Sequence, residues 1–379
     1  MLTAELLIIG GGIVGASVAY HAARAGLQVL VVDREDTGRA TSAGAGIVSQ
    51  SLVAHDVPQW TQLDAHAVAY YPQVVEMLAD DGESDCGYAT CDMLHLAFND
   101  GDARIFAAMK PEIARLQRSI QSKSLQGVEY LSTGEAREFF PALAPVQEAI
   151  FEPGVGRVDG RQIARSLRDA SVRHGATWLQ ENVQRLLISD TRAGGAVVDG
   201  EPVAAQAVVI AGGAWSAHFA DQLAVAVGVR PQRGQIVHLG TPEQDTQHWP
   251  ILHTLQGYYL VPWPDHRVAV GATREDGTGF DPSMTVAGIE EVFREAARMV
   301  PLLHDATLRE IRVGLRPSSL DGLPILGRVT HIDGVLLATG HGPVGLTHGP
   351  YTGKLITDLL LERTPDVDLA PFSAARFAA

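Results

Sequence analysis

The chain has 379 residues, of which 46% are hydrophobic and 19% are charged. This composition supports a large buried core and excludes a disordered chain or a small disulfide-held scaffold. Its 29 basic and 44 acidic residues give a net charge of −15, which argues against binding to nucleic-acid backbones. The sequence contains no run of about 18 apolar residues, so no membrane span is expected. Two cysteines, Cys86 and Cys91, are too few for a zinc tetrad; we expect free thiols in a cytoplasmic protein.

The start of the chain combines short apolar runs with a glycine-rich turn. We expect a strand over 6–9, a helix over 13–24 and a strand over 29–32. Between the first strand and the helix, three glycines have the spacing G-x-G-x-x-G, and an acidic residue follows the second strand: Gly10, Gly12, Gly15 and Asp33. Such glycines let backbone N–H groups approach a pyrophosphate, and the acid accepts hydrogen bonds from a ribose. The sequence therefore predicts a βαβ unit that binds a dinucleotide.

Later segments show further α/β elements and one β-rich region. The expected elements are, in chain order, helices 64–78 and 103–121, a helix that ends at Gly175, strands 176–179, 208–211, 235–239, 258–261 and 268–272, helix 286–299, strand 334–339 and helix 352–361. The pattern indicates nucleotide-binding pieces at the start, middle and end of the chain, with other material between them.

The glycine motif alone does not separate NAD from FAD, because both present an adenosine pyrophosphate to the same unit. Three features favour a flavin: the small-residue loop 39–46, the glycines after strand 208–211, and the sequence Gly-His-Gly at 340–342. Each could be an ordinary turn, but all three occur at the ends of strands or beside the motif, where backbone can lie against a flat ligand.

Taken together, these segments resemble the D-amino-acid-oxidase superfamily of FAD enzymes, most closely its glycine oxidase and sarcosine oxidase branch. The resemblance covers nearly the whole chain and rests on segments 10–15 with Asp33, 39–46, 208–215, 231–235, 259–262, 270–273, 314–317 and 340–345. It implies a two-domain α/β flavoprotein. A discontinuous Rossmann-like FAD-binding domain would comprise 1–85, 150–225 and 310–379, and a substrate domain with a mainly antiparallel sheet would comprise 86–149 and 226–309.

The resemblance also implies a set of site residues. The expected cofactor contacts come from Gly10, Gly12, Gly15, Asp33, Arg34, Thr41, Ser42, Gly46, Val183, Gly213, Trp215, Arg316, Gly342, Gly345, Leu346 and Thr347. The loop 41–46 and the segment 314–319 contain no His or Cys, which flavin-tethering relatives use, so the FAD should be non-covalent. Arg316 and Tyr259 are expected to bind a substrate carboxylate, and Arg274 to lie near the flavin, where a cation would stabilise superoxide. No metal site is expected.

Local sequence leaves alternatives for each of these side chains. Arg316 lies in an apolar stretch and needs an anion, which could be a substrate or a structural partner such as Asp321. Neighbouring tyrosines on a strand face opposite sides, so Tyr258 and Tyr259 cannot both line one site, and the resemblance selects Tyr259. Arg274 could instead be a solvated side chain beside acidic neighbours. We interpret His341, between two glycines, as a hydrogen-bonding residue rather than a base.

The expected reaction is oxidation of the C–N bond of a small amino acid or an N-substituted glycine, with hydride transfer to flavin N5, as in glycine oxidase. Oxygen or another compound would accept the electrons. One alternative is a D-amino-acid or D-hydroxyproline dehydrogenase that uses an acceptor other than oxygen. Others are a 2-hydroxy-acid oxidising flavoenzyme with His341 as base, and a non-catalytic subunit of a larger dehydrogenase. The substrate would be a small acid with a free carboxylate. The chain could also form a homo-oligomer.

Overall fold

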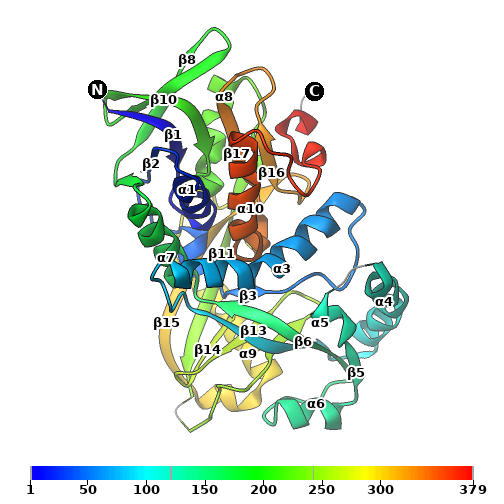
Figure 1. The fold of residues 1–379 in the computed structure, drawn as a ribbon. Helices are drawn as coiled ribbons and strands as arrows, with labels where there is room; N and C mark the ends of the chain where they lie inside the picture. The colour runs from blue at the N-terminus through cyan, green and yellow to red at the C-terminus, as the bar shows by residue number, and fades with distance from the viewer. Residues whose placement is uncertain (1, 120–121, 242, 378–379) are drawn as a thin grey trace.

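The computed structural model describes residues 2–119, 122–241 and 243–377, which form two sheets with helices around them (Figure 1). The strands of the first sheet are β1 (Thr3–Ile9), β2 (Val29–Val32), β7 (Thr177–Leu179), β8 (Val183–Ser189), β9 (Arg192–Val198), β10 (Glu201–Ile210), β16 (Ile325–Arg328) and β17 (Val335–Thr339). Those of the second are β3 (Ile47–Val48), β4 (Tyr88–Ala97), β5 (Glu129–Leu131), β6 (Glu148–Val158), β11 (Val229–Gly240), β12 (Ile251–Thr254), β13 (Tyr259–Trp263), β14 (Arg267–Gly271) and β15 (Thr307–Ser319).

The helices are distributed between the two halves of the molecule. They are α1 (Ile13–Arg24), α2 (Ala40–Ala43), α3 (Pro58–Asp80), α4 (Asp100–Ser119), α5 (Lys123–Gln126), α6 (Thr133–Phe139), α7 (Gly160–Arg173), α8 (Ala220–Leu223), α9 (Val286–Met299) and α10 (Gly345–Leu360). Short 3-10 helices are η1 (Gly213–Phe219), η2 (Pro301–Asp305), η3 (Gly342–Val344), η4 (Ala370–Phe372) and η5 (Ala374–Phe377). Among the helices so described, none is both long and apolar enough to cross a membrane.

The first sheet has the order β16-β17-β10-β1-β2-β7, and the hairpin β8–β9 extends from β10. Its central strands β17, β10, β1 and β2 run parallel, as in a dinucleotide-binding sheet. Helices α1 and α10 lie side by side on one face (Figure 1). They approach closely because Gly353 of α10 lies against Ser17 of α1, where a side chain would overlap backbone.

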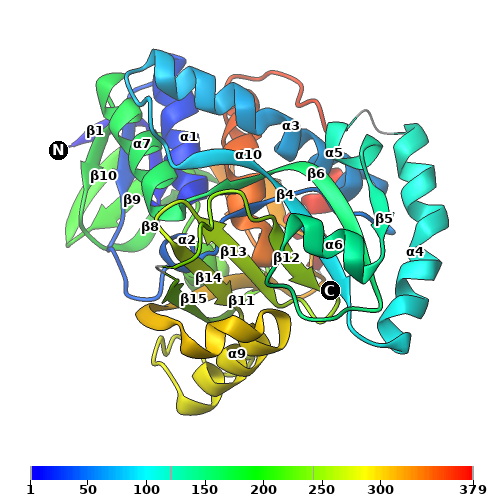
Figure 2. The same ribbon diagram turned by 90° about the horizontal axis from the view of Figure 1, so that it is seen from below.

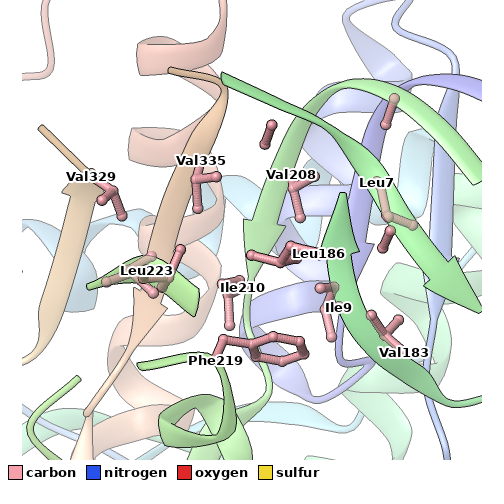
Figure 3. Close-up of a cluster of buried hydrophobic side chains, with 14 of the residues drawn as sticks. Leu7, Ile9, Val183, Leu186, Val208, Ile210, Phe219, Leu223, Val329 and Val335 are labelled. Carbon is pink, nitrogen blue, oxygen red and sulfur yellow. The ribbon is translucent and has the colours of Figure 1, made fainter. Parts of the chain in front are cut away.

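The opposite face of the first sheet carries a continuous apolar core (Figure 3). Leu7, Ile9, Val208 and Ile210 point from β1 and β10 toward side chains of the hairpin, of the end of η1 and of α8. Those partners include Val183, Leu186, Phe219 and Leu223. Alternate residues of buried strands therefore fill two cores, one on each face.

The second sheet has the order β15-β11-β14-β13-β12-β4-β6-β3. One face packs on α9, which lies beneath β11 and β14 (Figure 2). The other face carries Met93, Ile236 and Ile251, which pack with Ala45 and Ile47 from the first part of the chain. This second face therefore packs against the segment that follows β2.

Several predicted boundaries agree with the structure and others do not. Helices 13–24 and 286–299 and strand 29–32 are found with the predicted bounds. The small-residue loop 39–46 contains the one-turn helix α2, and residues 120–121 of the predicted helix 103–121 lie outside the described residues.

The division into domains stays a prediction, but sheet membership does not follow its residue ranges at three strands. Strands β3, β6 and β15 fall wholly or mostly within ranges assigned to the FAD-binding domain, yet they pair with strands of the second sheet. Apolar periodicity predicts that a strand exists but carries no information about its partner in a distant segment.

Candidate active site

A cavity of about 500 Å³ lies between the two sheets. Its walls come from the glycine turn after β1, the α2 segment, the residues after β10, the strands β11, β13 and β15, and the start of α10. The carboxyl ends of parallel strands are the usual place for a nucleotide in such a sheet. The same cavity therefore joins a nucleotide-type site to the face of the second sheet.

The glycine turn is shaped by close contacts between backbone segments. Gly10 has φ +104° and lies against the Ala211 carbonyl, and a side chain at Gly15 would overlap the Gly10 carbonyl. Among the atoms of the described residues, an added Cβ at Gly12 would meet only Thr41 Oγ1, at 3.2 Å. Gly10 and Gly15 thus keep the turn tight, whereas Gly12 leaves its backbone open to the cavity, as a pyrophosphate requires.

Asp33 stabilises this turn and also lines the cavity. Its carboxylate accepts hydrogen bonds from the backbone N–H groups of Gly11 and Glu35, the latter at 2.6 Å. Arg39 lies 3.7 Å from the same carboxylate. A carboxylate has about four lone-pair positions, so Asp33 still has acceptor capacity for ribose hydroxyls.

Most residues that the sequence suggests for the cofactor line this cavity. They are Gly10, Gly12, Asp33, Arg34, Thr41, Gly46, Val183, Gly213, Trp215, Arg316, Gly342, Gly345 and Leu346. Three lie elsewhere: Gly15 packs against the turn, Ser42 lines a neighbouring hollow, and Thr347 donates a hydrogen bond to the Ile47 carbonyl at 3.1 Å. These three can support the site but do not face its cavity.

Arg316 and Tyr259 meet at the end of the cavity formed by the second sheet. Arg316 Nη1 donates to the Thr273 carbonyl at 2.9 Å, and in the described ranges Arg316 has no ion pair with an acidic side chain. Asp321, the structural partner considered from the sequence, pairs with Arg376 at 2.7 Å instead. Burial lowers the pKa of Arg316. Burial also raises the pKa of Tyr259, and the positive charge of Arg316 partly opposes that rise. A partly buried cation that has no acidic partner among the described residues can bind an anion.

The two adjacent tyrosines have different surroundings. Tyr259 lines the cavity, and its hydroxyl lies over Gly271. Tyr258 packs with the core on the α9 side of the sheet and hydrogen-bonds to Glu291 of that helix. Because neighbouring residues of a strand face opposite sides, Tyr259 faces the cavity and Tyr258 faces the core.

Arg274 is exposed and lines the same cavity. Its Nη1 donates to the Gln256 carbonyl at 3.2 Å. Glu275, its neighbour in the sequence, pairs with Arg233 at 2.7 Å and leaves the Arg274 guanidinium available to the cavity. Arg274 is thus placed to act on a bound ligand, and its role as a cation for oxygen stays a prediction.

His341 lies at the cavity wall but is engaged by the protein. Its Nε2 is 3.0 Å from Thr352 Oγ1, and burial together with nearby His348 lowers its pKa to about 3. The ring is therefore neutral across the physiological range. A ring with so low a pKa is a weak base, and its Nε2 is engaged by Thr352, so this environment does not favour a hydroxy-acid reaction in which His341 acts as base.

Sequence reasoning passed over Gly234, which lies in the segment 231–235. Gly234 lines the cavity, and the Arg316 guanidinium occupies the space where a Cβ at Gly234 would lie. The signal was a glycine inside a β-rich stretch, which often marks the close approach of another group.

The comparisons with known proteins agree with this geometry. The family described as "FAD dependent oxidoreductase" matches residues 5–359. The chain belongs to this family. This oxidoreductase is 30% identical over 381 residues to glycine oxidase from Geobacillus kaustophilus, covering 98% of this chain and 97% of that one. It is 35% identical over 370 residues to uncharacterized oxidoreductase YurR from Bacillus subtilis, covering 97% and 98% of the two chains.

A solved structure extends this relation. Iminodiacetate oxidase from Chelativorans sp. BNC1 superposes with a TM-score of 0.91 at 39% identity, over 97% of this chain and 98% of that one. The two-domain α/β flavoprotein fold is thereby established, and FAD is the cofactor. The open backbone at Gly12 and the remaining acceptor capacity of Asp33 fit the pyrophosphate and ribose of this group.

Proposed function

We propose that this oxidoreductase oxidises the C–N bond of a small amino acid or an N-substituted glycine. The observation that carries the proposal is the pair Arg316 and Tyr259 at the second-sheet end of the cavity. A guanidinium offers a planar fork that matches a carboxylate, and a tyrosine hydroxyl adds one further donor. The pair therefore favours a substrate with a free carboxylate.

The chain's own residues contribute mainly orientation. FAD, when bound, supplies the acceptor for the hydride that leaves the α-carbon. Arg316 and Tyr259 hold the carboxylate and so fix the position of the α-carbon in the cavity. The acidic residues in the described lining are Asp33, Asp36 and Glu181, which lie with the nucleotide-type residues. Positioning of a neutral amine, without a dedicated base, can supply much of the rate.

The names of two relatives support this substrate class. One acts on glycine and the other on iminodiacetate, in which a single nitrogen carries two carboxymethyl groups. Both compounds contain an amine next to a CH₂ group and a carboxylate. A D-amino-acid or D-hydroxyproline dehydrogenase remains the second candidate, because the same carboxylate pair would serve it with a different electron acceptor.

Anaerobic flavin reduction by a panel of substrates tests the proposal. The panel contains glycine, sarcosine, D-alanine, D-hydroxyproline and iminodiacetate, with ethylamine as the plain amine that corresponds to D-alanine and glycolate as the hydroxy acid. We expect reduction by at least one amino acid or N-substituted glycine and none by glycolate. Reduction by glycolate alone, or equal reduction by an amine and its parent amino acid, would overturn the proposal. Reoxidation with oxygen or with a quinone then identifies the acceptor.

A further inference from the structure

A row of polar side chains crosses the cavity-facing side of the second sheet. Tyr259 of β13 pairs directly with His253 of β12, and His253 pairs with His95 of β4. Glu152 of β6 lies opposite Met93, which shares a face of β4 with His95. Residues paired across strands face the same side. Tyr259, His253, His95 and Glu152 therefore form one polar row that starts at the proposed carboxylate anchor.

Side-chain contacts link the members of this row. The rings of His253 and His95 are 5.5 Å apart, and His95 Nε2 is 2.9 Å from Glu152 Oε2. The Glu152 side chain is 0% exposed. Burial, His95 and Arg274 lower the pKa of His253 to about 3, so its ring is neutral at physiological pH. The row thus ends at a buried carboxyl group that has a histidine against one of its two oxygens.

The segment that contains Gln50 runs along β6 near the Glu152 end of the row. Ile47 pairs with Arg157 of β6, and Leu52 packs with Ile150 of the same strand. The segment between them therefore follows β6 past Glu152. Ser51 N–H donates to Asp64 at 2.7 Å and holds the backbone there. Gln50 itself is only 3% exposed.

Polar atoms at this end have no hydrogen-bond partner within the described part of the chain. They are Glu152 Oε1 and both Gln50 side-chain atoms, Oε1 and Nε2. Burying such atoms without partners costs free energy, and a carboxylate oxygen costs more than an amide. Two of the three atoms can accept hydrogen bonds: the Gln50 amide oxygen and one oxygen of the Glu152 carboxyl group. A ligand group that donates hydrogen bonds would satisfy them.

We propose that the polar row and Gln50 form a distal subsite for the nitrogen substituent of the substrate, and that this substituent ends in a hydroxyl or ammonium group. The proposal rests on the proposed function, which places the substrate carboxylate at Arg316 and Tyr259. From β13 to β6 there are three strand spacings, about 14 Å in all. The substituent that reaches Glu152 is therefore a chain of several atoms rather than a methyl group.

Binding of non-oxidisable analogues to the FAD-loaded enzyme tests the subsite separately from the reaction. The ligands are acids R–O–CH₂–COO⁻, in which an ether oxygen replaces the amine and leaves no C–N bond to oxidise. The group R is a straight chain of two, four or six carbons that ends in methyl, hydroxyl or ammonium. Diglycolate, with a second carboxylate, completes the set. Titration calorimetry gives each dissociation constant.

We expect hydroxyl and ammonium ends to bind roughly 10- to 100-fold tighter than methyl at four or six carbons, and with little difference at two. Glu152→Gln should remove most of the ammonium preference and part of the hydroxyl preference. Asp81→Asn is the matched control, because Asp81 also holds a histidine, His174, at 2.9 Å but lies at the far end of α3. This control should bind every analogue as the wild type does.

The outcomes separate the two proposals. Equal binding of all three chain ends by the wild type at every length would overturn the subsite. Ordered water would then be the only partner of the unpartnered Glu152 and Gln50 atoms. Diglycolate as the tightest ligand would also overturn it, because the substituent would then be a short acid. Failure of every acid to bind would refute the carboxylate anchor and with it the proposed function. These results come from the wild type, so they stand even if Glu152→Gln does not fold.

Discussion

The guanidinium of Arg316 lies directly over Gly234 of the neighbouring strand, in the space that a side chain there would fill. Strand β11 thus leaves space at Gly234 for the guanidinium of Arg316 on β15. A methyl group at Gly234 would push the guanidinium away from the position from which it contacts the Thr273 carbonyl.

Gly234→Ala should therefore weaken substrate binding by about 1 to 3 kcal/mol, because the charged hydrogen bonds lose their alignment. Flavin content should stay normal. Gly240→Ala is the control: it lies on the same strand, and its Cβ would meet the exposed side chain of Arg309, which can move. Stopped-flow flavin reduction gives the substrate dissociation constants. Equal constants in both variants and the wild type would show that Arg316 does not need this gap.

Removal of Arg316 itself should have a larger effect. Arg316→Ala should cost roughly 2 to 5 kcal/mol of substrate binding, because a carboxylate would be left buried without its partner. Arg316→Lys should recover little, since a point charge cannot reproduce the planar fork. The flavin spectrum should remain normal in both variants. If the flavin of the Arg316→Ala variant were reduced with the wild-type dependence on substrate concentration, Arg316 would not be the residue that binds the carboxylate.

The two tyrosines provide a matched pair for the hydroxyl contribution. Tyr259→Phe should cost about 0.5 to 1.5 kcal/mol of substrate binding, which corresponds to one hydrogen bond. Tyr258→Phe should leave binding unchanged, because that hydroxyl contacts Glu291 on the α9 side. Dissociation constants from flavin reduction compare the two. A larger loss in the Tyr258 variant would reverse the assignment of the strand's faces.

Local sequence predicted much of the nucleotide-binding half. The periodicity and glycine spacing around Gly10 and Asp33 gave the βαβ unit with its helix bounds, because these signals lie within a short continuous segment. The family resemblance added Arg316 and Tyr259, and the structure brings them together in one cavity, although they lie on strands that are far apart in sequence.

What the sequence could not supply were relationships between distant strands. The partner sheet of β6 depends on pairing with β4 and β3, which no local pattern specifies. The polar row has the same origin, because His95, Glu152 and His253 come from three strands that only the fold aligns. Isolated polar residues in apolar strands were the available signal, and alone they do not distinguish a subsite from a structural pair.

Cofactor binding should depend on the open backbone at Gly12. Gly12→Leu should abolish flavin binding, because its side chain would fill the approach to the turn. In the part of the chain that the structure describes, the only close neighbour of its Cβ would be Thr41. Gly194→Leu, at an exposed position on β9, should purify yellow like the wild type. Acid precipitation of the wild type should release all of the flavin as FAD. Flavin that stays with the precipitated polypeptide would contradict non-covalent binding.

Arg274 provides a test of how the reduced enzyme reacts with oxygen. Its exposed guanidinium lines the cavity and is held by the Gln256 carbonyl, whereas neighbouring Glu275 is engaged with Arg233. A fixed positive charge next to the reacting centre stabilises a developing anion such as superoxide. Because Arg274 is open to solvent, screening should limit its contribution to about 1 kcal/mol, or roughly a fivefold change in rate.

Arg274→Met should therefore slow reoxidation by oxygen about fivefold and leave the rate of flavin reduction nearly unchanged. Arg309→Met is the control, because Arg309 is also exposed but donates to the Asp265 carbonyl at 3.1 Å and does not line the cavity. Stopped-flow mixing of the reduced enzyme with oxygenated buffer measures the second-order rate constant. If both variants reoxidise at the wild-type rate, Arg274 has no role in the oxygen reaction. A selective loss of flavin reduction would instead place its charge on the substrate.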